Sequence, residues 1–280
     1  PPRSTLFPYT TLFRSKTIIM ANIDDLKFLE EQFIRCYDDV TYMAQFCTVR
    51  TLANGYVPFN LYDFQVSTLK QISKHDKVII TKSRQMGIST LLALETLHKL
   101  IFNDGYKVTV FANKQKTAEE VIDKIKLMYD RLPDWLKTGL TVVNKNKLEL
   151  QLSNGSGAKA FSSSSDAGRS QSANMVIMDE GAFIPNLEET MKAVLPVIST
   201  GGKLIILSSP NGIGNHFYKV WEEAMEGKNG FLPIKLKWDL HPDRDQRWRD
   251  EQDATMGKLG ARQEYDAEFV GSGNTVVDAD

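Results

Sequence analysis

Hydrophobic and polar positions in this sequence follow two periods, one typical of buried strands and one typical of amphipathic helices. Short runs that are apolar or nearly so occur at 78–80, 107–112, 175–178 and 203–207. A parallel strand covered on both faces must be apolar along its length, so these runs predict strands of one mainly parallel sheet. Helical spacing follows the first two runs, at 91–95 and 116–132. The pattern therefore predicts an α/β fold built from strand–helix units.

Weaker patterns surround this core. We expect a hairpin where 148–152 and 158–161 flank the turn-forming pair Asn154-Gly155, and a last strand at 231–238. Helices are expected at 24–34, 38–46, 61–70 and 261–265, with a turn at 54–58. These elements divide the chain into a core at 59–240, helical flanks at 20–58 and 241–270 that together form a small lid subdomain, and a Gly/Ser-rich linker at 271–280.

Composition adds limits rather than a function. The chain has 280 residues, 42% hydrophobic and 25% charged, as is typical of a soluble globular protein. Its net charge of −1 gives no support for a broad basic surface, so any contact with nucleic acid must be local. Cys36 and Cys47 form no C-x-x-C motif, which suits a reducing compartment. No apolar run approaches the roughly 20 residues that span a bilayer, so we expect no membrane partner.

The first fifteen residues are set apart from the rest. The stretch 5–15 resembles the translation of a widely used sequencing adapter. A targeting peptide has a continuous apolar segment, whereas Pro8 and the polar residues after it interrupt this one. We therefore treat 1–15 as non-native sequence and take Met20 as the expected native start.

The strand at 78–80 leads into a short polar loop and then a helix, an arrangement that presents backbone N–H groups to phosphate. The common phosphate-binding pattern is G-x-x-x-x-G-K-[ST]. Gly87 and Ser89 keep their places in it, but Lys82 stands at the first glycine and Ile88 at the lysine. Lys82 or Arg84 would then supply the cation for the phosphate oxygens; the alternative is an ordinary strand-to-helix turn. The expected nucleotide contacts are Lys82, Ser83, Arg84, Gln85, Met86, Gly87, Ile88, Ser89 and Thr90.

A second polar segment follows the apolar run 175–178, where Asp179 and Glu180 end the predicted strand. Ligands gather at the carboxyl ends of parallel strands, so both carboxylates are expected near the loop. Asp179 would hold Mg²⁺ together with Ser89, and Glu180 would polarise the water that attacks the γ-phosphate of ATP. The alternative is a strand that leads into an acidic helix cap. We favour ATP and Mg²⁺ binding because the two motifs lie in order, about 90 residues apart, with a strand–helix unit between them.

The apolar run 203–207 also ends in polar residues. Ser208 and Ser209 follow it directly, and Asn211 lies close by. Hydroxyl and amide groups at a strand end can sense a γ-phosphate through hydrogen bonds that break on hydrolysis. These residues are therefore candidates for sensing whether a γ-phosphate is present.

Two further features have both a simple and a functional interpretation. The polar loop 162–171 is either a flexible linker or a segment over the nucleotide, with Arg169 as a second cation. Gln65 is able to pair with both the donor and the acceptor edge of adenine. Taken alone, however, Gln65 is more simply interpreted as a solvated helix residue.

Several of these segments together resemble the ATPase half of the large terminase subunit of tailed bacteriophages. The similar stretches are 83–90, 179–186, 209–212, the helix with Gln65, and 263–269, within a span of about 38–273. The resemblance implies a P-loop NTPase of the RecA/ASCE type, with a three-layer fold, a mainly parallel central sheet and a small helical lid. It also implies a motor that hydrolyses ATP with Mg²⁺ and drives double-stranded DNA through a portal into a procapsid.

The resemblance assigns roles to individual residues. It implies adenine contact for Gln65, Mg²⁺ binding for Ser89 and Asp179, a catalytic carboxylate at Glu180, and coupling of hydrolysis to movement for Ser208, Ser209 and Asn211. Arg84 matches a loop arginine proposed to act in cis as a catalytic finger. Some family members carry their lysine at the start of the loop, as Lys82 does. The main phosphate cation therefore stays open between Lys82 and Arg84.

The implied partners are duplex DNA, the portal protein, a small terminase subunit and further copies of the chain in a ring on the portal, while the isolated chain is compatible with a monomer. The implied location is the cytoplasm of an infected bacterial host. Family members also carry an RNase H-like nuclease. Only seven residues follow Gly273, and Asp278 and Asp280 are too few for a two-metal site, so we expect no nuclease activity.

Two other functions remain alternatives to a packaging ATPase. The first is another DNA translocase or helicase of the same fold, although a helicase with a second RecA-like domain needs a longer chain. The second is a non-hydrolysing nucleotide-binding scaffold whose loop has lost its lysine at Ile88.

The placement of the loop lysine generates a first prediction. Lys82→Ala is expected to lower the rate of phosphate release from ATP by about a hundredfold, because it removes a cation from the phosphates. Ile88→Ala is expected to have a much smaller effect. The measurement is steady-state phosphate release by both variants, and comparable losses would show that this alignment of the loop is wrong.

Overall fold

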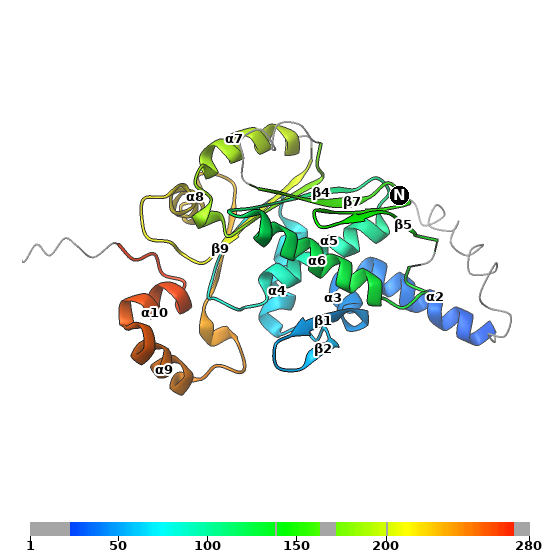
Figure 1. The fold of residues 1–280 in the computed structure, drawn as a ribbon, viewed down its shortest axis with the longest axis horizontal. Coiled ribbons are helices and arrows are strands. Elements are labelled where there is room, and N and C mark those ends of the chain that lie inside the picture. The colour runs from blue at the N-terminus through cyan, green and yellow to red at the C-terminus, as the bar shows by residue number, and fades with distance from the viewer. Residues whose placement is uncertain (1–22, 138, 163–171, 200, 272–280) are drawn as a thin grey trace, which may run out of the picture.

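Eight strands form one central sheet (Figure 1) in a computed structural model that describes residues 23–137, 139–162, 172–199 and 201–271. The strands are β3 (Lys77–Lys82), β4 (Lys107–Ala112), β5 (Val142–Asn146), β6 (Glu149–Leu152), β7 (Gly157–Ser162), β8 (Met175–Asp179), β9 (Lys203–Ser208) and β10 (Leu232–Leu236). Their spatial order is β10-β3-β9-β8-β4-β7-β6-β5. The five pairings from β10 to β7 are parallel and the last two are antiparallel. The predicted α/β fold with a mainly parallel sheet is confirmed.

The strand order brings the three motif-bearing strands side by side. β9 lies between β3 and β8, with Ser208 opposite Thr81 on one side and Leu207 opposite Asp179 on the other. Because the three strands are parallel, the polar residues that follow them emerge at the same edge of the sheet. The apolar runs therefore position the candidate site.

Helices cover both faces of the sheet and give three layers (Figure 1). One face carries α4 (Asp63–Lys74), α5 (Ile88–Phe102) and α6 (Gln115–Arg131), and the other carries α7 (Leu187–Ile198) and α8 (His216–Met225). Side chains of the strands alternate between the two layers, so Ile80 belongs to the core cluster that contains α5, and Ile79 to the one that contains α7 and α8. Burial on both faces explains why the strands carry few polar residues.

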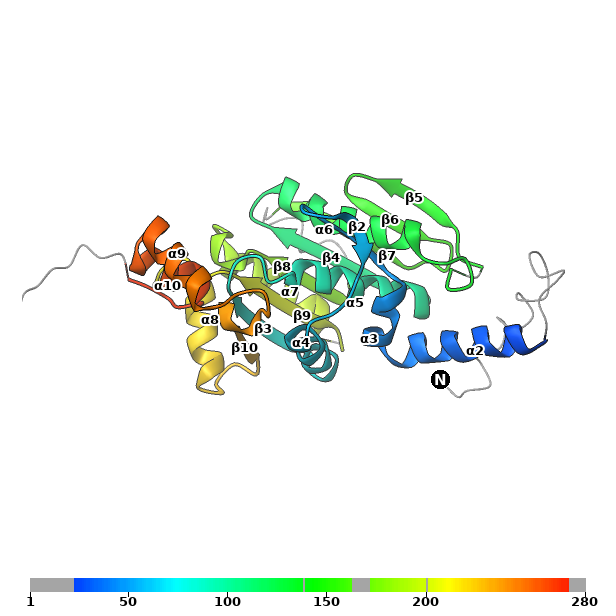
Figure 2. The same ribbon diagram turned by 90° about the horizontal axis from the view of Figure 1, so that it is seen from below.

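The helical flanks lie at opposite ends of the molecule. Figure 2 shows α2 (Ile23–Asp38) at one end of the long axis, and α9 (Gln246–Met256) and α10 (Lys258–Tyr265) at the other. α2 docks onto the core, where the rings of Phe33 and Tyr37 lie 5.3 and 5.5 Å from the ring of Phe102 in α5. The sequence predicts one lid subdomain from both flanks, whereas the structure places them apart. Among the residues described, no helix has the length and apolar character to cross a bilayer.

Several elements differ from the sequence-based expectation. The predicted turn at 54–58 is a strand, β2 (Gly55–Pro58), which pairs with β1 (Thr48–Thr51) in an antiparallel hairpin. The β-forming residues Tyr56 and Val57 outweigh the turn signal of Asn54-Gly55 once a partner strand is present. The helix predicted at 38–46 is shortened to α3 (Val40–Met43) followed by a 3₁₀ turn (Ala44–Phe46), because Asp39 caps a new helix by accepting a 2.8 Å hydrogen bond from the N–H of Thr41. β5, α7 and α8 have no counterpart in the prediction.

The packing of α8 gives a stability prediction. Phe217 is fully buried against the sheet, so Phe217→Ala is expected to lower the free energy of unfolding by about 3–5 kcal/mol. Met225, on the same helix, is 62% exposed, and Met225→Ala is expected to change the free energy by less than about 0.5 kcal/mol. Urea unfolding measures both variants, and equal losses would contradict the packing described for α8.

Candidate functional site

The loop between β3 and α5 has an uncommon backbone. Gln85 and Gly87 have positive φ angles of 58° and 72°. A Cβ atom on Gly87 would lie 2.8 Å from Nε2 of Gln65, so position 87 requires glycine for its backbone and for the space around it. α5 begins at the next residue, and the first N–H groups of a helix have no partner within it. The loop and the helix together offer N–H groups and a positive dipole end to a phosphate.

The two candidate lysine positions of the loop point to different surroundings. Ile88, the first residue of α5, is buried in the core cluster to which this helix belongs, so this position takes part in packing. Lys82 ends β3, and its side chain is 8% exposed with Nζ 3.0 Å from Oε1 of Glu180. The lysine at the start of the loop, Lys82, therefore contacts the acidic pair through Glu180.

Glu180 connects the ends of three strands. One carboxylate oxygen accepts the hydrogen bond from Lys82, and the other accepts a 3.3 Å hydrogen bond from the hydroxyl of Ser208 at the end of β9. Glu180 itself follows β8 and has a left-handed φ of 52°, which costs a non-glycine residue on the order of 1–3 kcal/mol. Three residues predicted from separate motifs are thus in direct contact.

Asp179 lies beside this cluster and is only 3% exposed. Burial raises the pKa of its carboxyl group above the ordinary value, whereas the charge of Lys82 and a hydrogen bond with the hydroxyl of Ser89 act in the opposite direction. A buried carboxylate next to a hydroxyl is a set of hard oxygen ligands of the kind that Mg²⁺ prefers. Asp179 and Ser89 therefore fit a Mg²⁺ ion, which would neutralise charge on bound phosphate oxygens.

Arg84, the other candidate cation, is paired with α10. Its Nη2 lies 3.3 Å from Oε1 of Glu264, its Nε donates to the second oxygen, and its backbone N–H donates to the carbonyl of Glu264 at 3.0 Å. The hydrogen bond with Glu264 raises the pKa of Arg84 above its ordinary value. In this structure Lys82, and not Arg84, contacts the acidic pair; the phosphate roles of both residues remain predictions.

Gln65 of α4 is buried and is not the solvated residue of the simpler interpretation. Its side-chain oxygen accepts a 3.1 Å hydrogen bond from the N–H of Tyr62, and its Nε2 donates to the carbonyl of Met86 at 3.1 Å. The side chain therefore joins the start of α4 to the phosphate loop. Its predicted contact with adenine stays a prediction.

The candidate coupling residues adjoin Glu180 through the backbone of Ala182. Ser208 accepts a 3.1 Å hydrogen bond from the N–H of Ala182, and Asn211 donates to the carbonyl of the same residue at 3.2 Å. Ser209 is buried next to Ser208. Arg169 and the stretches 1–15 and 272–280 lie outside the described residues, so the structure does not place them.

Two residues at this site were not assigned a role from sequence. Arg244, just ahead of α9, donates hydrogen bonds to Ser83, Arg84 and Gln85 of the loop. Glu264 holds Arg84, as described above. Both stand about 160–180 positions away from the loop in the sequence and within a charged or helical stretch, where no local signal marks their contacts.

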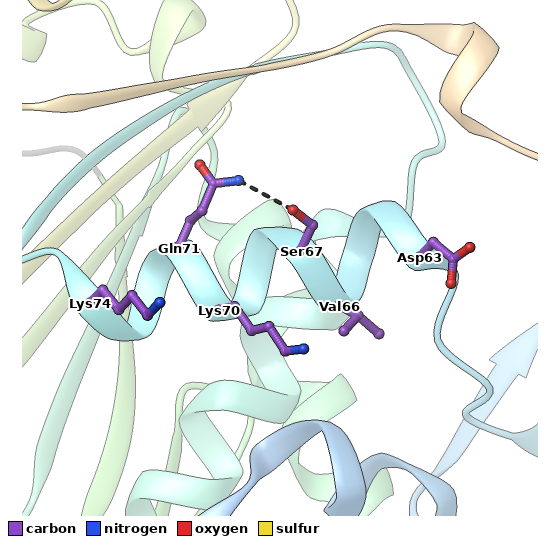
Figure 3. A pocket seen from close by; sticks show the side chains of 6 residues that line it. All are labelled: Asp63, Val66, Ser67, Lys70, Gln71 and Lys74. Atoms are coloured by element: carbon purple, nitrogen blue, oxygen red, sulfur yellow. Dashed lines mark hydrogen bonds between the residues drawn. The ribbon is translucent and has the colours of Figure 1, made fainter.

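A shallow groove of about 360 Å³ lies on the exposed side of α4 (Figure 3). It is lined by Asp63, Val66, Ser67, Lys70, Gln71 and Lys74, which all belong to this one helix. Gln71 donates a 3.4 Å hydrogen bond to Ser67 across it. The groove is separate from the loop, to which α4 contributes the buried Gln65.

The parallel sheet, the glycine-containing loop before α5 and the acidic pair at the end of β8 define a P-loop NTPase of the ASCE type. A sequence model of the family described as terminase large subunit, T4likevirus-type, N-terminal, matches residues 79–278. Because this match covers more than half of the chain, the chain belongs to that family. The resemblance noted from the sequence is confirmed.

Individual relatives agree. The chain is 27% identical over 253 residues to the large terminase subunits of Thermus phage G20c and of Thermus virus P23-45, and each match covers 79% of this chain and 50% of the relative. The chain thus spans about half the length of the curated relatives it matches. The large terminase ATPase domain of Thermus phage P74-26 has a TM-score of 0.61 at 23% identity, covering 76% of this chain and 95% of that domain. The HK97 bacteriophage large terminase has a TM-score of 0.67 at 16% identity, covering 83% and 55%.

The backbone of the loop gives a prediction with a matched control. Gly87 and Gly105 have similar positive φ angles, but a Cβ meets Gln65 only at Gly87 and open space at Gly105. Both alanine variants should lose about 1–2 kcal/mol of stability to backbone strain. Only Gly87→Ala should also weaken ATP binding, by about tenfold or more. Thermal unfolding and equilibrium binding of ATP test this, and equal ATP affinities would show that Gly87 does not shape the binding site.

Proposed function

We propose that this chain is the ATPase motor domain of a phage DNA-packaging terminase, which hydrolyses ATP with Mg²⁺ to move double-stranded DNA into a procapsid. The proposal is carried by the contact of Lys82 with Glu180, beside the buried Asp179 and its hydrogen bond with Ser89. A cation and two carboxylates next to a phosphate loop are the parts that hydrolysis of ATP requires. Family membership supports the proposal, as does a complex with ADP that a large terminase of similar fold, from a thermophilic bacteriophage, forms.

Binding of the phosphates falls to the loop and to the first turn of α5. Their N–H groups bind the oxygens, Ser89 and Asp179 hold Mg²⁺, and Lys82 adds a positive charge from the opposite side of the loop. Lys82 is largely removed from water, so its attraction to a phosphate is screened less than that of an exposed lysine. The side chain of Arg84 is 55% exposed and forms an ion pair with Glu264.

Glu180 accepts the proton of the attacking water. Both of its oxygens have partners, Lys82 and Ser208, which fix the orientation of the carboxylate before the reaction. A base that is already oriented needs little rearrangement in the transition state. Ser208 thus acts as a positioning residue for Glu180.

The same hydrogen bonds supply a route from hydrolysis to movement. A change at Glu180 reaches Ser208 directly, and Ala182 links it to Asn211. The segment 208–211 leads on to α8, so a change at the γ-phosphate alters the end of β9 and the element that follows. We propose that this movement is passed to duplex DNA when copies of the chain form a ring with a portal protein and a small terminase subunit, in the cytoplasm of an infected bacterium.

The base generates the central test. Glu180→Gln is expected to lower the rate of phosphate release by about 10²–10⁴-fold and to leave ATP binding within a few-fold, because the amide keeps the shape of the side chain but accepts no proton. The matched control is Glu188→Gln on α7, whose side chain is 53% exposed and forms an ion pair with Lys192. Its rate of phosphate release should equal that of the unchanged protein.

Two results would count against the proposal. Equal phosphate release by Glu180→Gln and the unchanged protein would exclude Glu180 as the base. ATP binding without any release by the unchanged protein, with and without duplex DNA, would favour the nucleotide-binding scaffold instead.

A further inference from the structure

Side chains from outside the strand–loop–helix unit hold three successive carbonyl groups of the phosphate loop. Arg244 donates through Nη2 to the carbonyls of Arg84 and Gln85, at 2.9 and 3.3 Å. Gln65 donates to the carbonyl of the next residue, Met86, at 3.1 Å. Arg244 also donates through Nη1 to the hydroxyl of Ser83 at 3.0 Å. Arg244 and Gln65 together therefore form hydrogen bonds with every residue from 83 to 86.

The direction of these carbonyls decides where the loop N–H groups point. In a trans peptide unit the C=O and the following N–H point to opposite sides. Holding the carbonyls of residues 84 and 85 toward Arg244 therefore turns the N–H groups of residues 85 and 86 away from it. Successive N–H groups that face one side form a concave site for an anion. Arg244 thus acts on the phosphate-binding surface of the loop without touching a phosphate.

Arg244 is fixed to the C-terminal helical pair. Its guanidinium group lies over the ring of Trp248 in α9, 4.7 Å from the ring centre, and that ring is 4.9 Å from the ring of Tyr265 in α10. Asp245, the next residue, caps α9 by accepting a 2.8 Å hydrogen bond from the N–H of Trp248. The position of Arg244 is therefore set by α9 and α10.

The charge of Arg244 also bears on the site. Within the part of the chain that the structure describes, the hydrogen bonds of its side chain all go to residues 83–86. Burial lowers the pKa of Arg244 below its ordinary value, whereas Tyr265 and Tyr62 act in the opposite direction. Among the described residues, the guanidinium group donates to carbonyl, hydroxyl and thioether groups rather than to a carboxylate, so its charge adds to the attraction of the loop for phosphate.

We propose that Arg244 is a positioning residue that keeps the phosphate loop in its anion-binding shape, so that the placement of α9 and α10 sets the affinity for nucleotide. The proposal rests on the proposed function, because it concerns the same site. It also predicts a direction of control, since any movement of α9 away from the core releases the carbonyls of Arg84 and Gln85 and weakens the grip on the phosphates.

The test compares Arg244→Gln and Arg244→Lys with Arg247→Gln. Arg247 lies on α9, is 86% exposed and forms an ion pair with Glu251 of the same helix at 3.4 Å. Equilibrium binding of ATP and of ADP is measured with Mg²⁺ for each protein, together with KM and kcat for phosphate release and the midpoint of thermal unfolding. Both nucleotides carry the phosphates that the loop holds, so both affinities report on its shape.

Arg244→Gln is expected to raise the Kd of ATP and of ADP about tenfold, and KM in parallel, because the charged hydrogen bonds of the guanidinium group to the loop are lost. kcat at saturating ATP should change by less than about threefold, since Glu180, Lys82 and Ser208 keep their contacts. Arg244→Lys should recover part of the affinity, because an ammonium group can still donate to one carbonyl. Arg247→Gln should bind both nucleotides as the unchanged protein does.

Three results would overturn the proposal: unchanged nucleotide affinity in Arg244→Gln, a fall in kcat with KM unchanged, or a loss of binding fully explained by unfolding in both Arg244 variants. Each of these is separate from failure of the proposed function. That failure would appear as absent phosphate release in the unchanged protein or as activity retained in Glu180→Gln, while the binding comparison at Arg244 still gives its own answer.

Discussion

The ion pair of Lys82 and Glu180 joins two strands that are not paired with each other. β3 and β8 are both neighbours of β9, and the contact passes over the end of β9, where Ser208 completes it. Removing a lysine and a glutamate from water offsets much of their attraction, so net stability is a weak reason for such a pair. Its place in the molecule is better explained by chemistry: the sheet order brings a cation, a base and a sensing hydroxyl to one point, and each is fixed by the end of its own strand.

Much of this arrangement follows from sequence, because the strands are buried on both faces and so carry a continuous apolar signal. The run before Asp179 and the run before Ser208 predict where polar groups leave the sheet, and parallel pairing then brings them together. Elements at the margins have weaker signals. β5 is an exposed edge strand with several polar residues, and its place depends on its pairing with β6 rather than on hydrophobicity. The hairpin of β1 and β2 likewise depends on strand pairing, which the local pattern of hydrophobic residues does not predict.

The contacts between the loop and the C-terminal helices lie beyond what sequence patterns reveal. Arg244 and Glu264 sit among many other charged residues, and nothing in their spacing distinguishes them from a solvated helix face. Ile88 is a second case in which the sequence pattern alone is misleading. As a departure from the usual loop pattern it raises doubt about the site, whereas its burial in the core explains it as packing, with Lys82 in position to supply the charge. Only the tertiary structure shows the contacts of Arg244 and Glu264 and the burial of Ile88.

The left-handed backbone of Glu180 bears on any attempt to make this protein more robust. Glycine adopts a φ near 52° without the strain that glutamate carries, but a glycine there would leave the buried Lys82 without its ion-pair partner. Removing one partner of a buried ion pair costs about 3–5 kcal/mol, which exceeds the strain of about 1–3 kcal/mol that glycine would relieve. Selection by heat resistance alone will therefore retain the side chain on which the proposed chemistry depends. Durability and activity thus favour the same residue at this position, and the unusual backbone is inherited together with the carboxylate.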